Sequence, residues 1–151
     1  MPSRTVQNRP KKAKAAGAAA RLNAHEDQLL DALTSAGAII ACADGWIERA
    51  ERDALADFVE RNEFLPALTR AEILGALDRR LRQFAARGGV EAALDRIGRY
   101  AGRAPARLVI DASRRVAEAD GALDAREIHF LQRIHIALGA PSTRGPALSA
   151  R

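Results

Sequence analysis

The chain is poor in cysteine, in aromatic side chains and in long apolar runs, and each shortage excludes a class of protein. Cys42 is the single cysteine among 151 residues, so an internal disulfide and a thiolate zinc site are both excluded. Aromatic residues make up only 4% of the composition. No apolar stretch approaches the roughly 20 residues that a membrane-spanning helix needs. These shortages predict a cytoplasmic protein without disulfides or membrane spans.

Motifs of the common enzyme classes are also missing. The sequence contains no glycine-rich phosphate loop, no nucleophile elbow, and no serine or cysteine beside recognisable acid–base partners. We therefore expect a protein that is not an enzyme and has no catalytic residues.

Alanine, leucine and arginine dominate what is present, and β-branched residues are sparse, which favours helices. Apolar residues recur at helical spacing, and several of these runs begin with a cap residue followed three positions later by glutamate. The clearest of these pairs are Asn23 with Glu26, Thr69 with Glu72, and Asp124 with Glu127. The pattern predicts an all-α fold, a compact bundle of about six helices over residues 24–139.

Charge is divided unevenly between this domain and the segments that flank it. Residues 1–23 carry six basic residues and no acid, which leaves 18 of the 24 basic residues against all 19 acids in the remainder. We expect residues 1–23 to be a basic disordered tail and residues 140–151 a flexible C-terminal tail. The N-terminal tail suggests, weakly, a nucleic acid or an anionic membrane as a partner, through nonspecific electrostatics alone.

One segment of the domain is repeated 76 positions later. Residues 43–51 read Ala-Asp-Gly-Trp-Ile-Glu-Arg-Ala-Glu, and residues 119–127 read Ala-Asp-Gly-Ala-Leu-Asp-Ala-Arg-Glu. Glycine after aspartate allows a positive φ and a tight turn. The apolar residue two positions after the glycine is expected to point into the core. The acids that follow suit the N-terminus of the next helix. The repeat predicts two helix–turn–helix units that need no ligand for their stability.

This doubled Asp-Gly turn in an alanine-rich helical domain resembles the tellurite-resistance TerB family, and is also similar to the N-terminal domain of DjlA-type co-chaperones. The resemblance covers roughly residues 24–139, with the two turns as its sharp motifs. It implies a cytoplasmic module for stress response and tellurite resistance, whose acidic surface contacts metal ions or partner proteins. The chain departs from the family in its basic tail and its arginine-rich middle, and lacks the His-Pro-Asp tripeptide of a J-domain.

Two further interpretations of the turns stay open beside the capping role. The spacing of the acids partly matches a calcium-binding EF-hand loop, but Ile40 and Val116 stand at the first ligand position, which excludes a complete loop. A looser, weak divalent-cation site remains, in which the ligands are Asp44, Glu48 and Glu51 in the first turn, or Glu118, Asp120, Asp124 and Glu127 in the second.

The turns could instead contact other proteins, through Asp44, Asp120 and Trp46. Trp46, the sole tryptophan, is interpreted either as a partial core plug or as an exposed anchor for a partner. Residues 44–63 contain seven acids against three arginines, whereas residues 79–107 contain eight arginines against two acids. This division suits charged protein partners or self-association, unless both segments are ordinary solvated helix faces.

Overall fold

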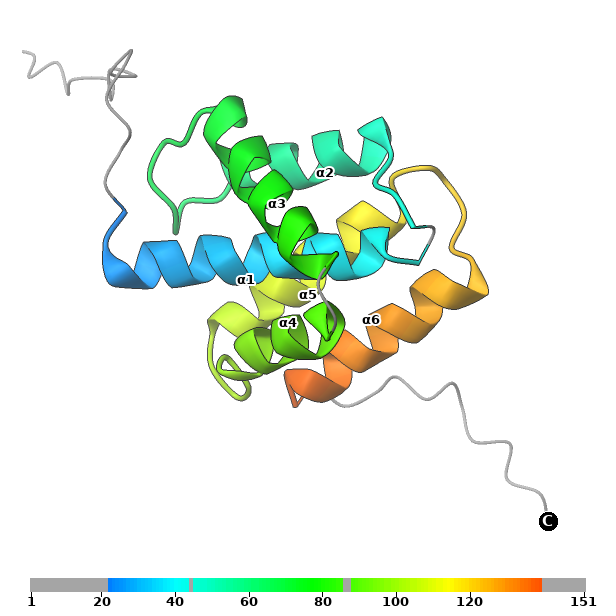
Figure 1. Ribbon diagram of the computed structural model, residues 1–151. Helices are drawn as coiled ribbons and strands as arrows, with labels where there is room; N and C mark the ends of the chain where they lie inside the picture. The colour runs from blue at the N-terminus through cyan, green and yellow to red at the C-terminus, as the bar shows by residue number, and fades with distance from the viewer. Residues whose placement is uncertain (1–21, 44, 86–87, 140–151) are drawn as a thin grey trace, which may run out of the picture.

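The computed structural model describes residues 22–43, 45–85 and 88–139, and these ranges form six α-helices without a strand. The helices are α1 (Ala24–Ala41), α2 (Arg49–Glu60), α3 (Arg70–Phe84), α4 (Gly89–Gly98), α5 (Pro105–Ala117) and α6 (Ala125–Ala137) (Figure 1). The predicted six-helix, all-α fold is confirmed. Of the two expected tails, only Leu22 and Asn23 lie within the described residues. Across those residues, none of the helices is long and apolar enough to cross a membrane.

Local sequence signals place the helix ends. The side chains of Asn23, Thr69 and Asp124 each accept a hydrogen bond from the backbone N–H three residues later, and the glutamate at that position bonds back. These reciprocal bonds satisfy N–H groups that the first turn of a helix leaves without partners. Helix α4 begins at Gly89, directly after Gly88, whose backbone is left-handed with φ of 81°.

Helix α1 lies at the centre of the bundle, with the other five helices packed around it (Figure 1). The sequence indicates a single apolar stripe on this helix, formed by Leu29, Leu33, Ala36 and Ile40. In the structure every residue from Ala32 to Ala41 is buried. The stripe prediction is therefore too narrow: alanine, glycine and serine fill the remaining faces and let neighbouring helices approach closely. At Gly37, an added Cβ would lie 2.9 Å from Cδ2 of Leu55 in α2.

The repeat predicted from the sequence is visible in the core. The aligned pairs from α1 and α5 are Leu33 with Val109, Ala36 with Ala112, and Ile40 with Val116. All six side chains are at most 1% exposed. The two helix–turn–helix units, α1–α2 and α5–α6, therefore contribute equivalent positions to one hydrophobic core, and α3 and α4 connect them.

Candidate interaction surface at the two turns

The two Asp-Gly turns lie at the same end of the bundle. The first joins α1 to α2, the second joins α5 to α6, and Figure 1 shows both loops side by side. Arg126, in the first turn of α6, connects them, because its Nη1 donates to the backbone oxygen of Ala43 at 3.4 Å. We call this region, formed by the described residues of 42–51 and 118–128, the turn end.

Glycine sets the direction of both turns. Gly45 has φ of 83° and Gly121 has φ of 107°, values that residues with a Cβ atom rarely adopt. The predicted positive φ is confirmed at both positions. Asp44, which precedes the first of these glycines, lies outside the described residues.

Two carboxylates of the turn end are buried and act as helix caps. Glu51 accepts a hydrogen bond from the N–H of Glu48 at 2.6 Å, and Glu127 accepts one from the N–H of Asp124 at 2.8 Å. Their side chains are only 4% and 3% exposed. In the second turn the Asp124 side chain also accepts from the N–H groups of Arg126 and Glu127. These bonds are the local reason for the acid spacing of the repeat.

The other acids of the turn end, Glu48, Glu118 and Asp120, are exposed. Within the described ranges, no three histidine, cysteine, aspartate or glutamate side chains are grouped so that they could hold a metal ion. Because Asp44 is not among the described residues, the cation site suggested for the first turn is not described completely. Divalent-metal binding stays a prediction.

Trp46 projects from the first turn into solvent. Its side chain is 68% exposed, so the core-plug interpretation is wrong, and the role of an anchor for a partner stays a prediction. The next residue, Ile47, is the one that packs against the core. Its counterpart Leu123 was also expected to point inward, but it is 40% exposed, and Ile128 beside it is 42% exposed. The turn end therefore presents apolar side chains from both turns.

Comparison with known proteins identifies the domain. The family model described as "Tellurite resistance protein TerB" matches residues 30–145, which include both turns and nearly all six helices. The chain belongs to the TerB family. No curated protein and no solved structure shows a significant match. The family resemblance carried by the two turns in the sequence is thus confirmed.

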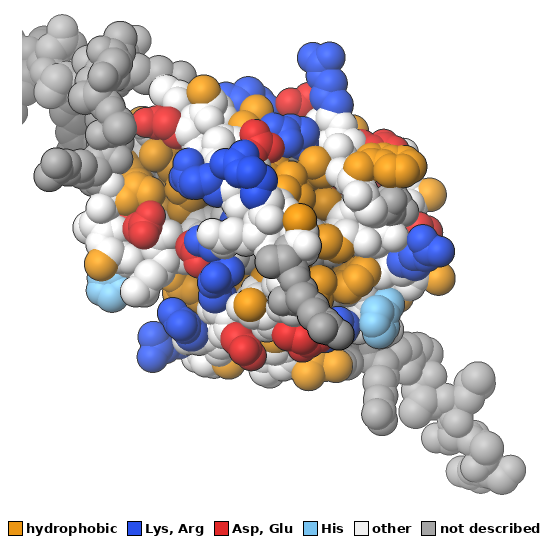
Figure 2. Space-filling view, in the orientation of Figure 1, with side chains coloured by type: hydrophobic (Ala, Val, Ile, Leu, Met, Phe, Trp, Pro, Cys, Tyr) orange, Lys and Arg blue, Asp and Glu red, His pale blue; other side chains and the backbone are white. Residues whose placement is uncertain are grey.

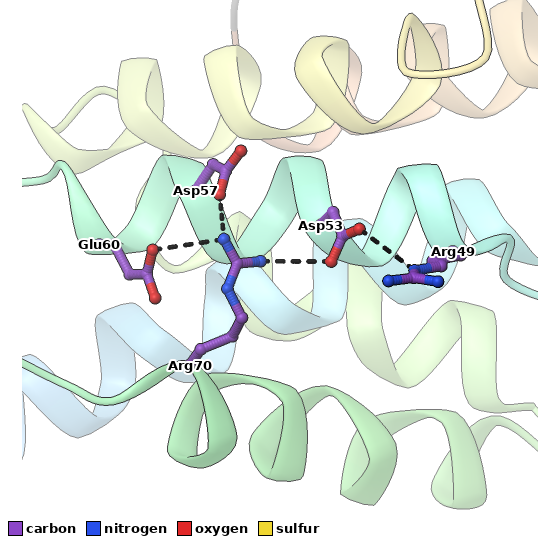
Figure 3. Close-up of polar contacts among 5 residues, drawn as sticks. All are labelled: Arg49, Asp53, Asp57, Glu60 and Arg70. Atoms are coloured by element: carbon purple, nitrogen blue, oxygen red, sulfur yellow. Dashed lines mark hydrogen bonds and ion pairs between the residues drawn. The ribbon is translucent and has the colours of Figure 1, made fainter.

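Three acids of the acidic segment of this TerB domain surround one arginine that lies outside that segment. Arg70, the first residue of α3, reaches across to α2 and pairs with Asp53 at 3.3 Å, with Glu60 at 3.4 Å, and with Asp57 (Figure 3). Arg49 adds a pair to Asp53 at 3.7 Å. These acids lie 10 to 17 residues before Arg70, so no local charge pattern shows the pairing.

A second pair connects the same two helices. Arg52 of α2 donates from Nη1 and Nη2 to the two carboxylate oxygens of Asp78 in α3, at 2.7 and 3.2 Å. This hydrogen-bonded pair lowers the pKa of Asp78 below its ordinary value. Together with the contacts of Arg70, it joins α2 to α3 through two sets of ion pairs.

Cys42 lies at the end of α1, beside the first turn. Its thiol is half-buried, and burial raises its pKa above the ordinary value. A raised pKa reduces the thiolate fraction at neutral pH, which disfavours a reactive cysteine.

Proposed function

We propose that this TerB-family protein acts in tellurite resistance as a non-enzymatic module in the cytoplasm, and that it binds other proteins through the turn end. The observation that carries the proposal is the exposure of Trp46 at the tip of a turn anchored by a buried cap. A large aromatic side chain held on a rigid turn loses little entropy on binding, and tryptophan is enriched among the residues that dominate binding energy.

The side chains around Trp46 indicate the chemistry of the partner. Leu123 and Ile128 extend the apolar surface. The turn end has two exposed basic residues, Arg49 and Arg126, and four exposed acids: Glu48, Glu118, Asp120 and Asp124. We therefore expect a partner segment with an apolar anchor flanked by lysine or arginine, because such a segment complements both features.

The proposal is tested with Trp46→Ala in the full chain, and Phe64→Ala is the matched control. Phe64 is 71% exposed on the α2–α3 connection, so both variants remove an exposed aromatic ring with little effect on the core. Tagged proteins capture partners from cells exposed to tellurite, and quantitative mass spectrometry compares the captured sets. We expect Phe64→Ala to retain specific partners and Trp46→Ala to lose them. The same partners, once purified, should bind the unmodified chain directly.

Trp46 also provides a direct signal, because it is the only tryptophan in the chain. Its fluorescence emission is expected at the wavelength of a solvent-exposed indole in the free protein, and at shorter wavelength when a purified partner covers the ring. Partners that bind Trp46→Ala as tightly as the unmodified chain, with no change in tryptophan emission on binding, would refute the proposed surface.

A further inference from the structure

Arginine side chains gather on a different face of the domain, where α3 and α4 flank the N-terminal half of α1 (Figure 2). Two small clefts meet there at Asp31 of α1. One is lined by Arg79 and Arg80 of α3, and the other by Arg96, Arg99 and Arg103 of α4 and the connection that follows it. We call these five arginines the arginine face.

The acids within this face offset only part of its charge. Asp31 pairs with Arg80 and lies 4.0 Å from Nε of Arg96, and Asp27 is the other acid that lines the clefts. The two aspartates leave an excess of three positive charges on the arginine face. Burial and the neighbouring Arg96 lower the pKa of Arg80, as expected where positive charges are crowded.

Three of the five arginines are available for a ligand. Arg79, Arg99 and Arg103 are exposed, and their guanidinium groups form no hydrogen bond or ion pair with other described residues. They therefore present planar donor groups to solvent, the geometry that suits bidentate contacts with phosphate oxygens.

The composition of the face indicates which polyanion it fits. The exposed large hydrophobic residues of the described chain lie elsewhere, at the turn end, on the α2–α3 connection and on α6. A membrane-binding face would combine basic residues with exposed apolar side chains, and a protein interface would have an apolar centre. Tyr100, the aromatic ring in the clefts, packs against the core, which disfavours base stacking with a single strand.

We propose that the arginine face binds the phosphodiester backbone of a nucleic-acid duplex without reading its sequence. Interfaces of this kind are polar and strongly positive, and contacts to phosphates supply sequence-independent affinity. Residues 1–23, which directly precede α1 in the sequence, carry six further basic residues. This site is independent of the turn end and of the function proposed for it.

The test measures the binding of the full chain to a labelled DNA duplex of about 20 base pairs, and to an RNA duplex of the same sequence, by fluorescence anisotropy. Potassium chloride is varied from about 50 to about 200 mM, because the affinity of proteins for the phosphate backbone changes steeply over this range. The triple variant Arg79→Gln, Arg99→Gln, Arg103→Gln is compared with a control triple of equal net charge. That control changes three exposed arginines outside the face: Arg49→Gln, Arg61→Gln and Arg115→Gln.

We expect the unmodified chain to bind both duplexes with an affinity that falls steeply with salt. The face variant should weaken DNA binding on the order of tenfold or more at the lowest salt, and should flatten the slope of log K against log salt by up to about 2.7, roughly 0.9 for each lost phosphate contact. The control triple should retain more of both. Circular dichroism confirms that each variant is folded.

A third variant separates the face from the preceding segment, with Lys11, Lys12 and Lys14 changed to glutamine in the full chain. If this variant loses all duplex binding while the face variant loses none, the proposal is wrong. It is also wrong if neither duplex binds at the lowest salt, or if vesicles containing phosphatidylserine bind in an arginine-dependent manner and the duplexes do not.

Discussion

Replacement of Glu127 tests whether the repeated acids of the turns are helix caps. Glu127 is 3% exposed and accepts a hydrogen bond of 2.8 Å from the N–H of Asp124. The Glu127→Ala variant removes this acceptor. The Glu127→Gln variant keeps a carbonyl oxygen that can accept the same bond, and glutamine is the other residue that completes a capping box. The two variants therefore separate the need for an acceptor from the need for a negative charge.

The expected magnitudes follow from this contact. Loss of the acceptor leaves a partly buried N–H without a partner and should cost about 1–2 kcal/mol of unfolding free energy in Glu127→Ala. The Glu127→Gln variant keeps the acceptor and loses the interaction of the charge with the helix N-terminus, about 0.5 kcal/mol. At roughly 3–5 °C per kcal/mol for a domain of this size, the alanine variant should melt well below the glutamine variant.

Thermal and urea denaturation followed by circular dichroism measure both variants, and Glu118→Ala is the control. Glu118 belongs to the same turn but its side chain is 52% exposed, with a single ion pair to Arg114 at 4.0 Å, so its removal should change stability by less than about 0.5 kcal/mol. The cap interpretation is refuted if Glu127→Gln is as unstable as Glu127→Ala while millimolar calcium or magnesium raises the melting temperature of the unmodified chain alone. That outcome would assign the carboxylate to a cation.

Two further predictions concern packing and charge. In α3, the Cβ added by Gly75→Ala would meet only Nη1 of Arg79, at 3.8 Å, so this variant should gain about 0.5–1 kcal/mol of stability from helix propensity. Gly37→Ala should lose that gain, because Leu55 must move to make room for the new Cβ. Equal effects of the two variants in urea denaturation would contradict the close packing of α1. The lowered pKa of Asp78 means that its pair with Arg52 stabilises the fold above the ordinary aspartate pKa of about 4 and that this contribution is lost as pH falls below it. Asp78→Asn should therefore cost about 0.5–1 kcal/mol at pH 7 and progressively less as the pH is lowered below the ordinary aspartate pKa, and a cost that does not change with pH would contradict the pairing.

Local signals in the sequence were sufficient for the helix boundaries and for the repeat. A capping box such as that of Asp124 and Glu127 uses residues three positions apart, and the positive φ at Gly121 follows from the residue type. Such features depend on neighbours along the chain, so they can be predicted without knowledge of the tertiary fold.

Features that depend on distant segments were not predicted. Arg70 pairs with acids of the preceding helix because α2 and α3 pack together, and no local pattern places the three carboxylates around it. The burial of α1 on all faces arises because five helices surround it, although its alanines and Ser35 are only weakly hydrophobic. The sequence left two interpretations of Trp46 open, because hydrophobicity alone does not distinguish the tip of a turn from its base, where Ile47 packs.

The central position of α1 has a consequence for synthesis. This helix leaves the ribosome before the rest of the domain, yet it packs extensively against α5, which begins more than sixty residues after α1 ends. A growing chain therefore exposes an apolar helix until most of its surroundings have been translated, and neither helix–turn–helix unit alone can enclose it. We expect nascent chains that stop before α5 to bind chaperones or aggregate, and the domain to fold only once α5 has emerged.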